Sequence, residues 1–120
     1  MSRTRGWTIG LAVLALAAAA LTAVVFASAR SLVMIENRSG GTLTLSVETT
    51  RPGQFSWQGD LPAGGRVVRT ARFSDNSFVV VCRDEAGVHR TRGGYVTNGR
   101  PQLVQISADG CAAVRIDVRS

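Results

Sequence analysis

Residues 78–82 read Phe-Val-Val-Val-Cys, an uninterrupted apolar run in which β-branched side chains predominate. Strands that are covered on both faces typically have this composition, because neither face needs polar side chains. The run therefore predicts a central strand, and the neighbouring segments are expected to pair on either side of it.

Two segments with a different pattern frame this run in the chain. Residues 42–48 alternate between polar and apolar side chains, and residues 113–119 do the same near the C-terminus. A period of two predicts a strand with one buried face. After Arg30 no segment has the 3.6-residue apolar repeat of an amphipathic helix.

Glycine-containing turns separate the expected strands. Residues 39–41, 84–87 and 109–110 each predict a hairpin, and 61–65 predicts a further loop. The expected strands are 32–38, 42–50, 55–57, 66–73, 78–83, 88–92, 103–107 and 111–119. Short strands joined by such turns indicate a sandwich or a small barrel. We predict an all-β fold: a small antiparallel β-sandwich of seven or eight strands, immunoglobulin-like or transthyretin-like.

Two cysteines are placed where they could join parts of this sandwich. Cys82 ends the apolar run, and Cys111 is expected to open the last strand. In an exported domain an even number of cysteines favours a bridge, although two separate buried thiols are the alternative. A bridge over this separation would stabilise the domain by about 3 to 4 kcal/mol on the chain-entropy model.

The N-terminus carries a targeting segment. Residues 9–29 contain no charged side chain and, as a helix, would rise about 32 Å, which matches the hydrocarbon thickness of a bilayer. Arg3 and Arg5 precede the segment and favour a cytoplasmic N-terminus. We expect residues 1–8 in the cytoplasm, 9–29 as a preceding hydrophobic helix that anchors the chain, and 30–120 as an extracytoplasmic domain, periplasmic or extracellular. The alternative is a signal peptide cleaved after Ala29, which would release the domain.

Charge alone does not identify a partner. All fourteen basic residues are arginines, against eight acidic ones, and the net charge is +6. Arginine suits phosphate and nucleic-acid recognition. The complete absence of lysine is better explained by the codon bias of a GC-rich genome, and an exported domain seldom meets nucleic acid. We predict no nucleic-acid partner, while anionic lipids and polysaccharides remain within reach.

No catalytic signature stands out. Nucleophile-elbow, P-loop and dinucleotide motifs are absent from the sequence, and one histidine without Cys-x-x-Cys spacing does not predict a metal site. If residues 84–87 form a hairpin, Arg83 pairs with Val88 and His89 faces Cys82, the minimum for thiol chemistry. A structural role for Cys82 is the preferred interpretation, so we predict a protein that is not an enzyme and has no cofactor.

The best candidate for a binding surface follows that hairpin. Arg90 and Arg92 share a strand face, while Tyr95 and Arg100 lie in or near a Gly-rich segment where a ligand can approach the backbone. Binding surfaces favour arginine and tyrosine. The plainer interpretation is a solvated strand face followed by a bulge at residues 93–94.

Three short segments and the apolar N-terminus carry a resemblance. The segments are Ile35-Glu36-Asn37-Arg38-Ser39-Gly40, Gly59-Asp60-Leu61-Pro62-Ala63-Gly64 and Gly94-Tyr95-Val96-Thr97-Asn98-Gly99. With these features the chain resembles small uncharacterised membrane-anchored or exported β-sandwich proteins of bacteria. The resemblance implies a fold and a location, and it assigns no catalytic residue.

Three functions are therefore open. The leading one is a single-pass membrane-anchored interaction module that contacts a protein of the bacterial envelope, for example through an exposed sheet edge. The second is a secreted or anchored binder of anionic envelope components through Arg90, Arg92 and Arg100. The third is a thiol-dependent enzyme, which requires a free Cys82.

Overall fold

The computed structural model describes residues 30–98 and 100–119, and within them the chain forms eight strands and no helix. The predicted anchor at residues 9–29 and the segment before it lie outside the described residues. In the part that is described, no helix is long and apolar enough to cross a membrane. The strands are β1 (Ser31–Asn37), β2 (Leu43–Thr49), β3 (Ser56–Leu61), β4 (Arg66–Ala71), β5 (Asn76–Asp84), β6 (Gly87–Val96), β7 (Leu103–Ala108) and β8 (Val114–Arg119).

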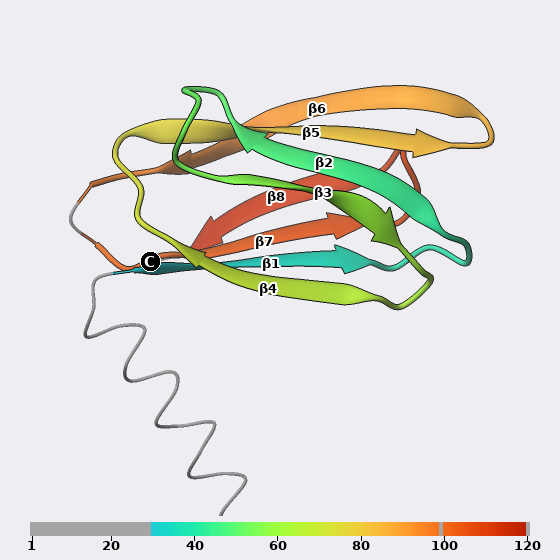
Figure 1. The fold of residues 1–120 in the computed structure, drawn as a ribbon, viewed down its shortest axis with the longest axis horizontal. Coiled ribbons are helices and arrows are strands. Elements are labelled where there is room, and N and C mark those ends of the chain that lie inside the picture. Colours follow the sequence, from blue (N-terminus) through green and yellow to red (C-terminus); the bar gives the residue numbers. More distant parts are fainter. Residues whose placement is uncertain (1–29, 99, 120) are drawn as a thin grey trace, which may run out of the picture.

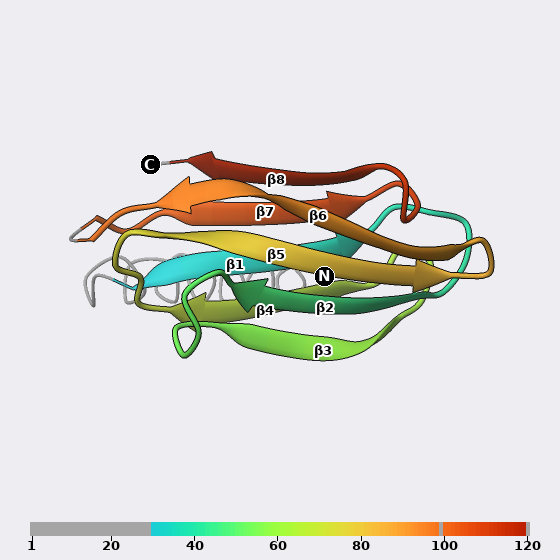
Figure 2. The ribbon, with the colours of Figure 1, turned by 90° about the horizontal axis from the view of Figure 1, so that it is seen from above.

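The strands form two four-stranded sheets that lie face to face (Figures 1 and 2). One sheet has the order β4-β1-β7-β8, and the other has the order β3-β2-β5-β6. The predicted all-β sandwich is thus confirmed. The expectation of wholly antiparallel pairing is wrong at one place, because β1 and β7 run parallel. Their ends are joined by a long excursion of the chain through the other sheet, which a parallel pair requires.

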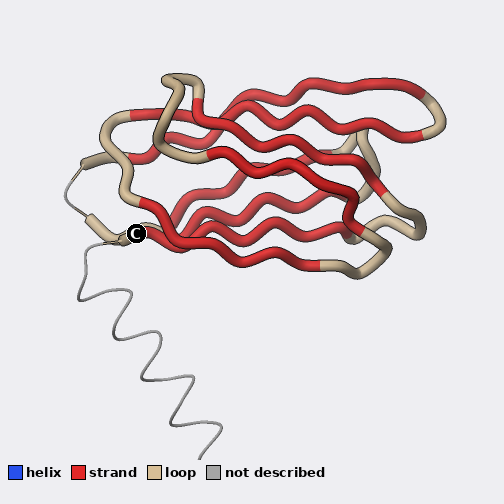
Figure 3. Tube along the Cα trace, in the orientation of Figure 1, coloured by secondary structure: helices blue, strands red, loops and turns tan. Residues whose placement is uncertain are grey.

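The strands of the two sheets make up two layers joined by loops (Figure 3), and alternating residues of each sheet are buried between them. Along β1 and β2 every second side chain is buried, as the period of two predicts for β2. Phe78, Ile35 and Leu45 are the largest fully buried side chains, and the ring of Phe78 meets that of Phe73 edge-on with centroids 5.3 Å apart. The outermost strand β8 is less covered, with its alternate apolar side chains half-buried against the core.

β5 holds the apolar run and lies between β2 and β6, as expected for a central strand. Its inward side chains Phe78, Val80 and Cys82 are 0% exposed. Val79 and Val81 point to the opposite face and are only half-buried. The expectation that both faces are covered is therefore wrong, because no described element packs on the outer face of this sheet.

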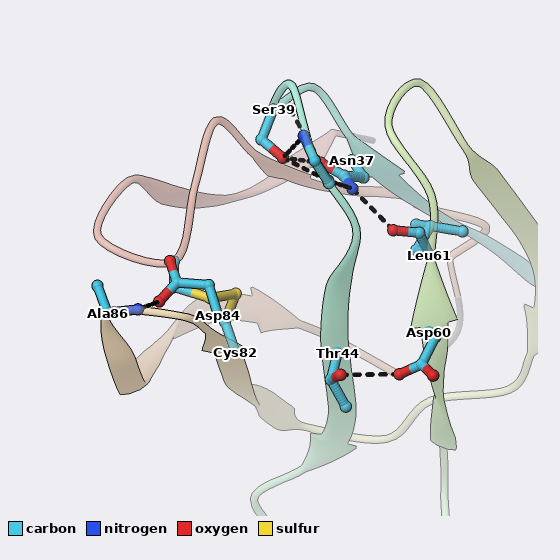
Figure 4. Close-up of a disulfide and its surroundings, with 10 residues drawn as sticks. Asn37, Ser39, Thr44, Asp60, Leu61, Cys82, Asp84 and Ala86 are labelled. Carbon is cyan, nitrogen blue, oxygen red and sulfur yellow. Dashed lines mark hydrogen bonds between the residues drawn. A yellow bond between two sulfur atoms is a disulfide. The ribbon is translucent and has the colours of Figure 1, made fainter.

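The turn at residues 39–41 connects the two sheets and is not a hairpin, which corrects a third expectation. β1 pairs with β4 and β7, whereas β2 pairs with β3 and β5. The buried side chain of Asn37 directs this change of layer. Its amide nitrogen donates to the carbonyls of Gly41 and Leu61, each at 2.8 Å, and its oxygen accepts from the backbone N–H of Ser39 at 2.9 Å (Figure 4).

The other two predicted hairpins are present. Between β5 and β6, Arg83 pairs with Val88, and the Asp84 carboxylate accepts a hydrogen bond from the N–H of Ala86 at 2.9 Å. The turn between β7 and β8 is longer than predicted and extends to Ala113. Cys111 lies in this turn and does not open the strand, because the chain there leaves the ladder and reaches across to the other sheet.

The predicted disulfide between Cys82 and Cys111 is confirmed. Their Cα atoms are 5.1 Å apart and the two residues are 29 positions apart in the chain. The bond joins the central strand of one sheet to the turn that precedes the edge strand of the other. It therefore ties the two layers together at one end of the sandwich, which we call the disulfide end.

Candidate binding face on the outer sheet surface

A bulge in β6 determines which side chains share the outer face of the β3-β2-β5-β6 sheet. Ser77 pairs with Tyr95, but the next residue of β5, Phe78, pairs with Gly93, so Gly94 is the extra residue. Gly94 has φ of 66°, a conformation that glycine adopts without steric cost. The bulge resets the alternation, and Tyr95 faces outward like Arg90 and Arg92.

A second constraint also requires glycine at this position. A Cβ added to Gly94 would lie 2.6 Å from Cγ2 of Ile116 and 3.2 Å from Cγ2 of Val118. β6 thus approaches β8, the edge of the other sheet, closely enough to exclude any side chain. The bulge predicted at residues 93–94 is thus present, and it helps to form the exposed basic face.

Residues of β2, β5 and β6, together with Thr50 just after β2, surround a shallow groove of about 230 Å³, which we call the outer groove. It is lined by Ser46, Glu48, Thr49, Thr50, Val79, Val81, Arg90 and Arg92. Val79 lies between Glu48 and Arg92 in the strand register, and Val81 lies between Ser46 and Arg90. The groove thus has an apolar floor, a basic wall on β6 and a polar, partly acidic wall on β2.

The two arginines of the groove are exposed and available for a ligand. Among the described residues, the recorded ion pairs are those of Glu36 with Arg38 and Arg66, so neither Arg90 nor Arg92 is engaged. Glu48 is two strands away from Arg92, with backbones about 10 Å apart, and among the described residues no ion pair joins the two side chains. An acidic group entering the groove would reach Arg90 or Arg92 without displacing an internal partner.

Tyr95 extends this face toward the end of the sandwich at which β1 begins. It is 60% exposed, although its hydroxyl is close to Asp75 and Arg51. Desolvation, and then the charge of Asp75 and a hydrogen bond to its carboxylate, raise the pKa of the Tyr95 hydroxyl, while Arg51 acts in the opposite direction. The hydroxyl therefore remains protonated and serves as a donor.

Arg100 does not join this face. It is exposed in the connection between β6 and β7 and is not among the residues that line the outer groove. The four residues singled out from the sequence thus separate into Arg90, Arg92 and Tyr95 on the sheet surface and Arg100 at the end of the sandwich.

The pairing of Cys82 with His89 follows the predicted register, but the two side chains differ in environment. Cys82 is fully buried and oxidised, whereas His89 is exposed on the edge strand. In the part of the chain that the structure describes, no three metal-ligating side chains cluster. Cys82 is therefore part of the cross-linked core, whereas His89 lies in solvent at the edge of the sheet.

A larger hollow of about 410 Å³ lies at the disulfide end. It is lined by Ser39, Gly41, Thr42, Leu43, Asp84, Glu85, Ala86 and Gly110. Much of this lining is turn backbone, and the Asp84 carboxylate already accepts from Ala86 within its own turn. The hollow is thus a space between three converging connections, whereas the outer groove presents unengaged side chains.

The sequence pattern predicts one wall of the outer groove, Arg90 and Arg92, but neither its floor nor its second wall. It predicts that Val79 and Val81 are covered, and it gives Ser46 and Glu48 only as the polar side of a strand. One signal in the sequence could have predicted the floor. If β2 has a polar outer face, a strand that pairs with it must turn half of its side chains to the same face, so an apolar strand such as β5 places apolar side chains there.

Comparisons with known proteins do not assign the chain to a family. No protein-family model matches the chain, and no curated protein matches it. A solved NMR structure of a protein from Eubacterium rectale is similar, with 14% sequence identity and a TM-score of 0.47, and the match covers 75% of this chain and 88% of that one. The proposals below rest on the residues of this chain.

Proposed function

We propose that the chain is a single-pass membrane-anchored module of the bacterial envelope that binds a protein partner in the outer groove and performs no catalysis. One observation carries this proposal. The central strand β5 keeps two apolar side chains, Val79 and Val81, on a face that no described element covers, and unengaged arginines flank them. Val79 and Val81 are half-buried, so they offer a partner a small apolar floor between the basic and polar walls of the groove.

The composition of the groove favours a protein over a uniformly charged polymer. Glu48 stands opposite the basic wall, so a polyanion that approached Arg90 and Arg92 would also meet a carboxylate. A polypeptide can offer an apolar side chain to the floor, an acidic group to one wall and a donor to the other. Arginine and tyrosine are also the side chains that most often contribute strongly to protein interfaces.

The location belongs to the same proposal. Residues 9–29 are long enough and apolar enough to span a bilayer, and the disulfide is the kind of bond that persists outside the cytoplasm. We assign the sandwich to the immunoglobulin-like or transthyretin-like type, which its two four-stranded layers and its bond between layers support. Cleavage after Ala29 would release the same domain with the same groove.

Site-specific photocrosslinking tests the groove. A photoreactive amino acid replaces Val79 in the full chain, and in a matched variant it replaces Met34, which lies on the outer face of the other sheet. In the native envelope we expect one discrete protein adduct from position 79 and none from position 34. The adduct should be lost in the Arg90→Ala/Arg92→Ala background, and it should be weakened but still detectable when crosslinking is carried out at high salt, because the apolar contacts remain. Equal adducts from both positions, or none from position 79, would contradict the proposal.

Protease accessibility tests the location. Protease added to intact spheroplasts should digest the domain of residues 30–120, whereas a cytoplasmic control protein stays intact. Digestion only after lysis would overturn the extracytoplasmic assignment. Intact mass then separates an anchored chain beginning at Met1 from a released one beginning at Arg30.

Thiol-dependent chemistry is the weaker alternative, because Cys82 is bonded to Cys111. Alkylation of the unreduced protein decides between the two. We expect neither cysteine to be labelled without reductant, and labelling of Cys82 in the native protein would favour the enzyme.

A further inference from the structure

The two ends of the sandwich differ in charge. At one end of the sandwich the odd-numbered strands begin and the even-numbered strands end (Figure 1). The connections 50–55, 72–75 and 97–102 therefore meet there. We call this the basic end. Its connections and strand termini carry Arg30, Arg51, Arg72, Arg100 and Arg119, with Asp75 as the acidic residue among them.

The disulfide end has the opposite balance. Its turns and strand termini carry Asp84, Glu85 and Asp109. Arg38, Arg66 and Arg83 also lie there, but Arg38 and Arg66 both pair with Glu36, at 3.7 and 3.3 Å. The arginines of the basic end are different: among the described residues, Arg51, Arg100 and Arg119 have no carboxylate in ion-pair contact and are exposed.

The basic end is also well ordered by internal hydrogen bonds. The buried Asn76 accepts from the N–H of Arg51 at 2.9 Å and donates to its carbonyl at 3.1 Å. The buried Gln102 accepts from the N–H of Thr97 at 2.8 Å, and its own N–H donates to the hydroxyl of Ser31 at 3.0 Å. These contacts fix the backbone around Arg51 and connect the segment before Arg100 to the start of β1.

Arg30, the first residue that the structure describes, lies at the same end. The apolar N-terminal run ends at Ala29, and Arg30 is held at this end by hydrogen bonds from its Nε to the Thr70 hydroxyl at 3.1 Å and from its Nη2 to the Thr70 carbonyl at 3.2 Å. Arg30 directly precedes β1, so in the sequence one residue stands between position 29 and the first strand. If residues 9–29 span a bilayer, the basic end is the part of the domain next to the membrane surface.

We propose that the basic end docks on anionic phospholipid headgroups of the membrane that holds the anchor, with Arg51, Arg100 and Arg119 as the principal contacts. The guanidinium group binds phosphate oxygens through paired hydrogen bonds. Docking orients the long axis of the sandwich away from the bilayer and presents the outer groove and the disulfide end to partners. This inference rests on the anchoring part of the proposed function.

The test uses the full chain in lipid nanodiscs of two compositions, phosphatidylcholine alone and phosphatidylcholine mixed with phosphatidylglycerol. Hydrogen exchange is followed by mass spectrometry in peptides covering the connections 50–55 and 72–75. We expect slower exchange in the phosphatidylglycerol discs. High salt should remove the difference, because the screening length shrinks to about 3 Å at 1 M.

Matched charge variants locate the effect. The triple variant Arg51→Gln/Arg100→Gln/Arg119→Gln should abolish the lipid-dependent protection, since each arginine changes the ratio of docked to free orientations by about fivefold. The control Arg38→Gln/Arg83→Gln/Arg115→Gln removes the same charge elsewhere and should retain the protection. Neither set touches the outer groove.

Each outcome decides the inference. Equal exchange in the two lipids, or equal loss of protection in both triple variants, overturns docking while leaving the groove and the anchor untouched. A chain that fails to remain in the discs overturns the anchor and docking with it. Photocrosslinking at Val79 then reports separately on the groove.

Discussion

The two faces of β5 differ although their side chains are chemically alike. Val80 is 0% exposed between the sheets, whereas Val79 and Val81, its direct neighbours in the chain, form the floor of an open groove. The difference arises because the second sheet covers only one face. An apolar side chain is more stable when it is buried, but whether it is buried depends on which other elements pack against it. On the outer face Val79 and Val81 are only partly covered.

The largest expected effect separates these two faces directly. Phe78→Ala should lower the free energy of unfolding by about 3 to 5 kcal/mol, because it opens a cavity beside Phe73 in the fully packed core. Val79→Ala on the outer face should cost no more than about 1 kcal/mol. Urea unfolding of the full chain in mild detergent measures both. Similar losses in the two variants would mean that the outer face is covered as well.

The disulfide bond tests whether the layers need a covalent link. Cys82→Ala/Cys111→Ala should destabilise the domain by about 3 to 4 kcal/mol, since the unfolded chain regains the freedom of a loop closed over 29 residues. Unfolding of the wild-type chain with and without reductant provides the control, and both comparisons should give the same loss. A change below about 1 kcal/mol would show that inter-sheet packing suffices without the bond.

One buried asparagine stabilises the loops at each end of the sandwich, Asn37 at the disulfide end and Asn76 at the basic end, so the two can be compared. Asn37→Ala should cost about 2 kcal/mol, because it deprives the carbonyls of Gly41 and Leu61 of their donor. Asn76→Ala should cost a similar amount by releasing the backbone of Arg51. Hydrogen exchange should show the loosening confined to the mutated end, and loosening at both ends would contradict local control.

The smallest expected effect concerns the bulge that turns Tyr95 outward. Gly94→Ala should cost about 1 to 2 kcal/mol, because φ is positive there and the new methyl group would collide with Ile116. Gly93→Ala is the control, since its Cβ would meet Ile116 at an ordinary 3.9 Å. Thermal unfolding ranks the two. Equal stability would place the tight contact with β8 in doubt.

Much of the fold could be predicted from local pattern. The alternation in residues 42–48 predicted β2 with its buried face, and the hairpin of Asp84 to Gly87 predicted the register that sets His89 opposite Cys82. Both depend on neighbouring residues in the chain, for which side-chain periodicity and turn chemistry are direct physical causes. The disulfide was also predictable, because only two cysteines are present to form it.

Contacts between distant segments decided the rest. The hairpin expected at residues 39–41 became a crossing between sheets because Asn37 bonds to Leu61, and β1 joined β7 in parallel, which no local pattern specifies. The outer groove and the basic end have the same origin: each gathers side chains from several strands or connections. The sequence by itself determined the strands, their polar and apolar faces and the bridge, because these follow from residues near one another or from the cysteine count. Only the tertiary structure decided which apolar faces stay open and where the charges collect, because both depend on which strands become neighbours.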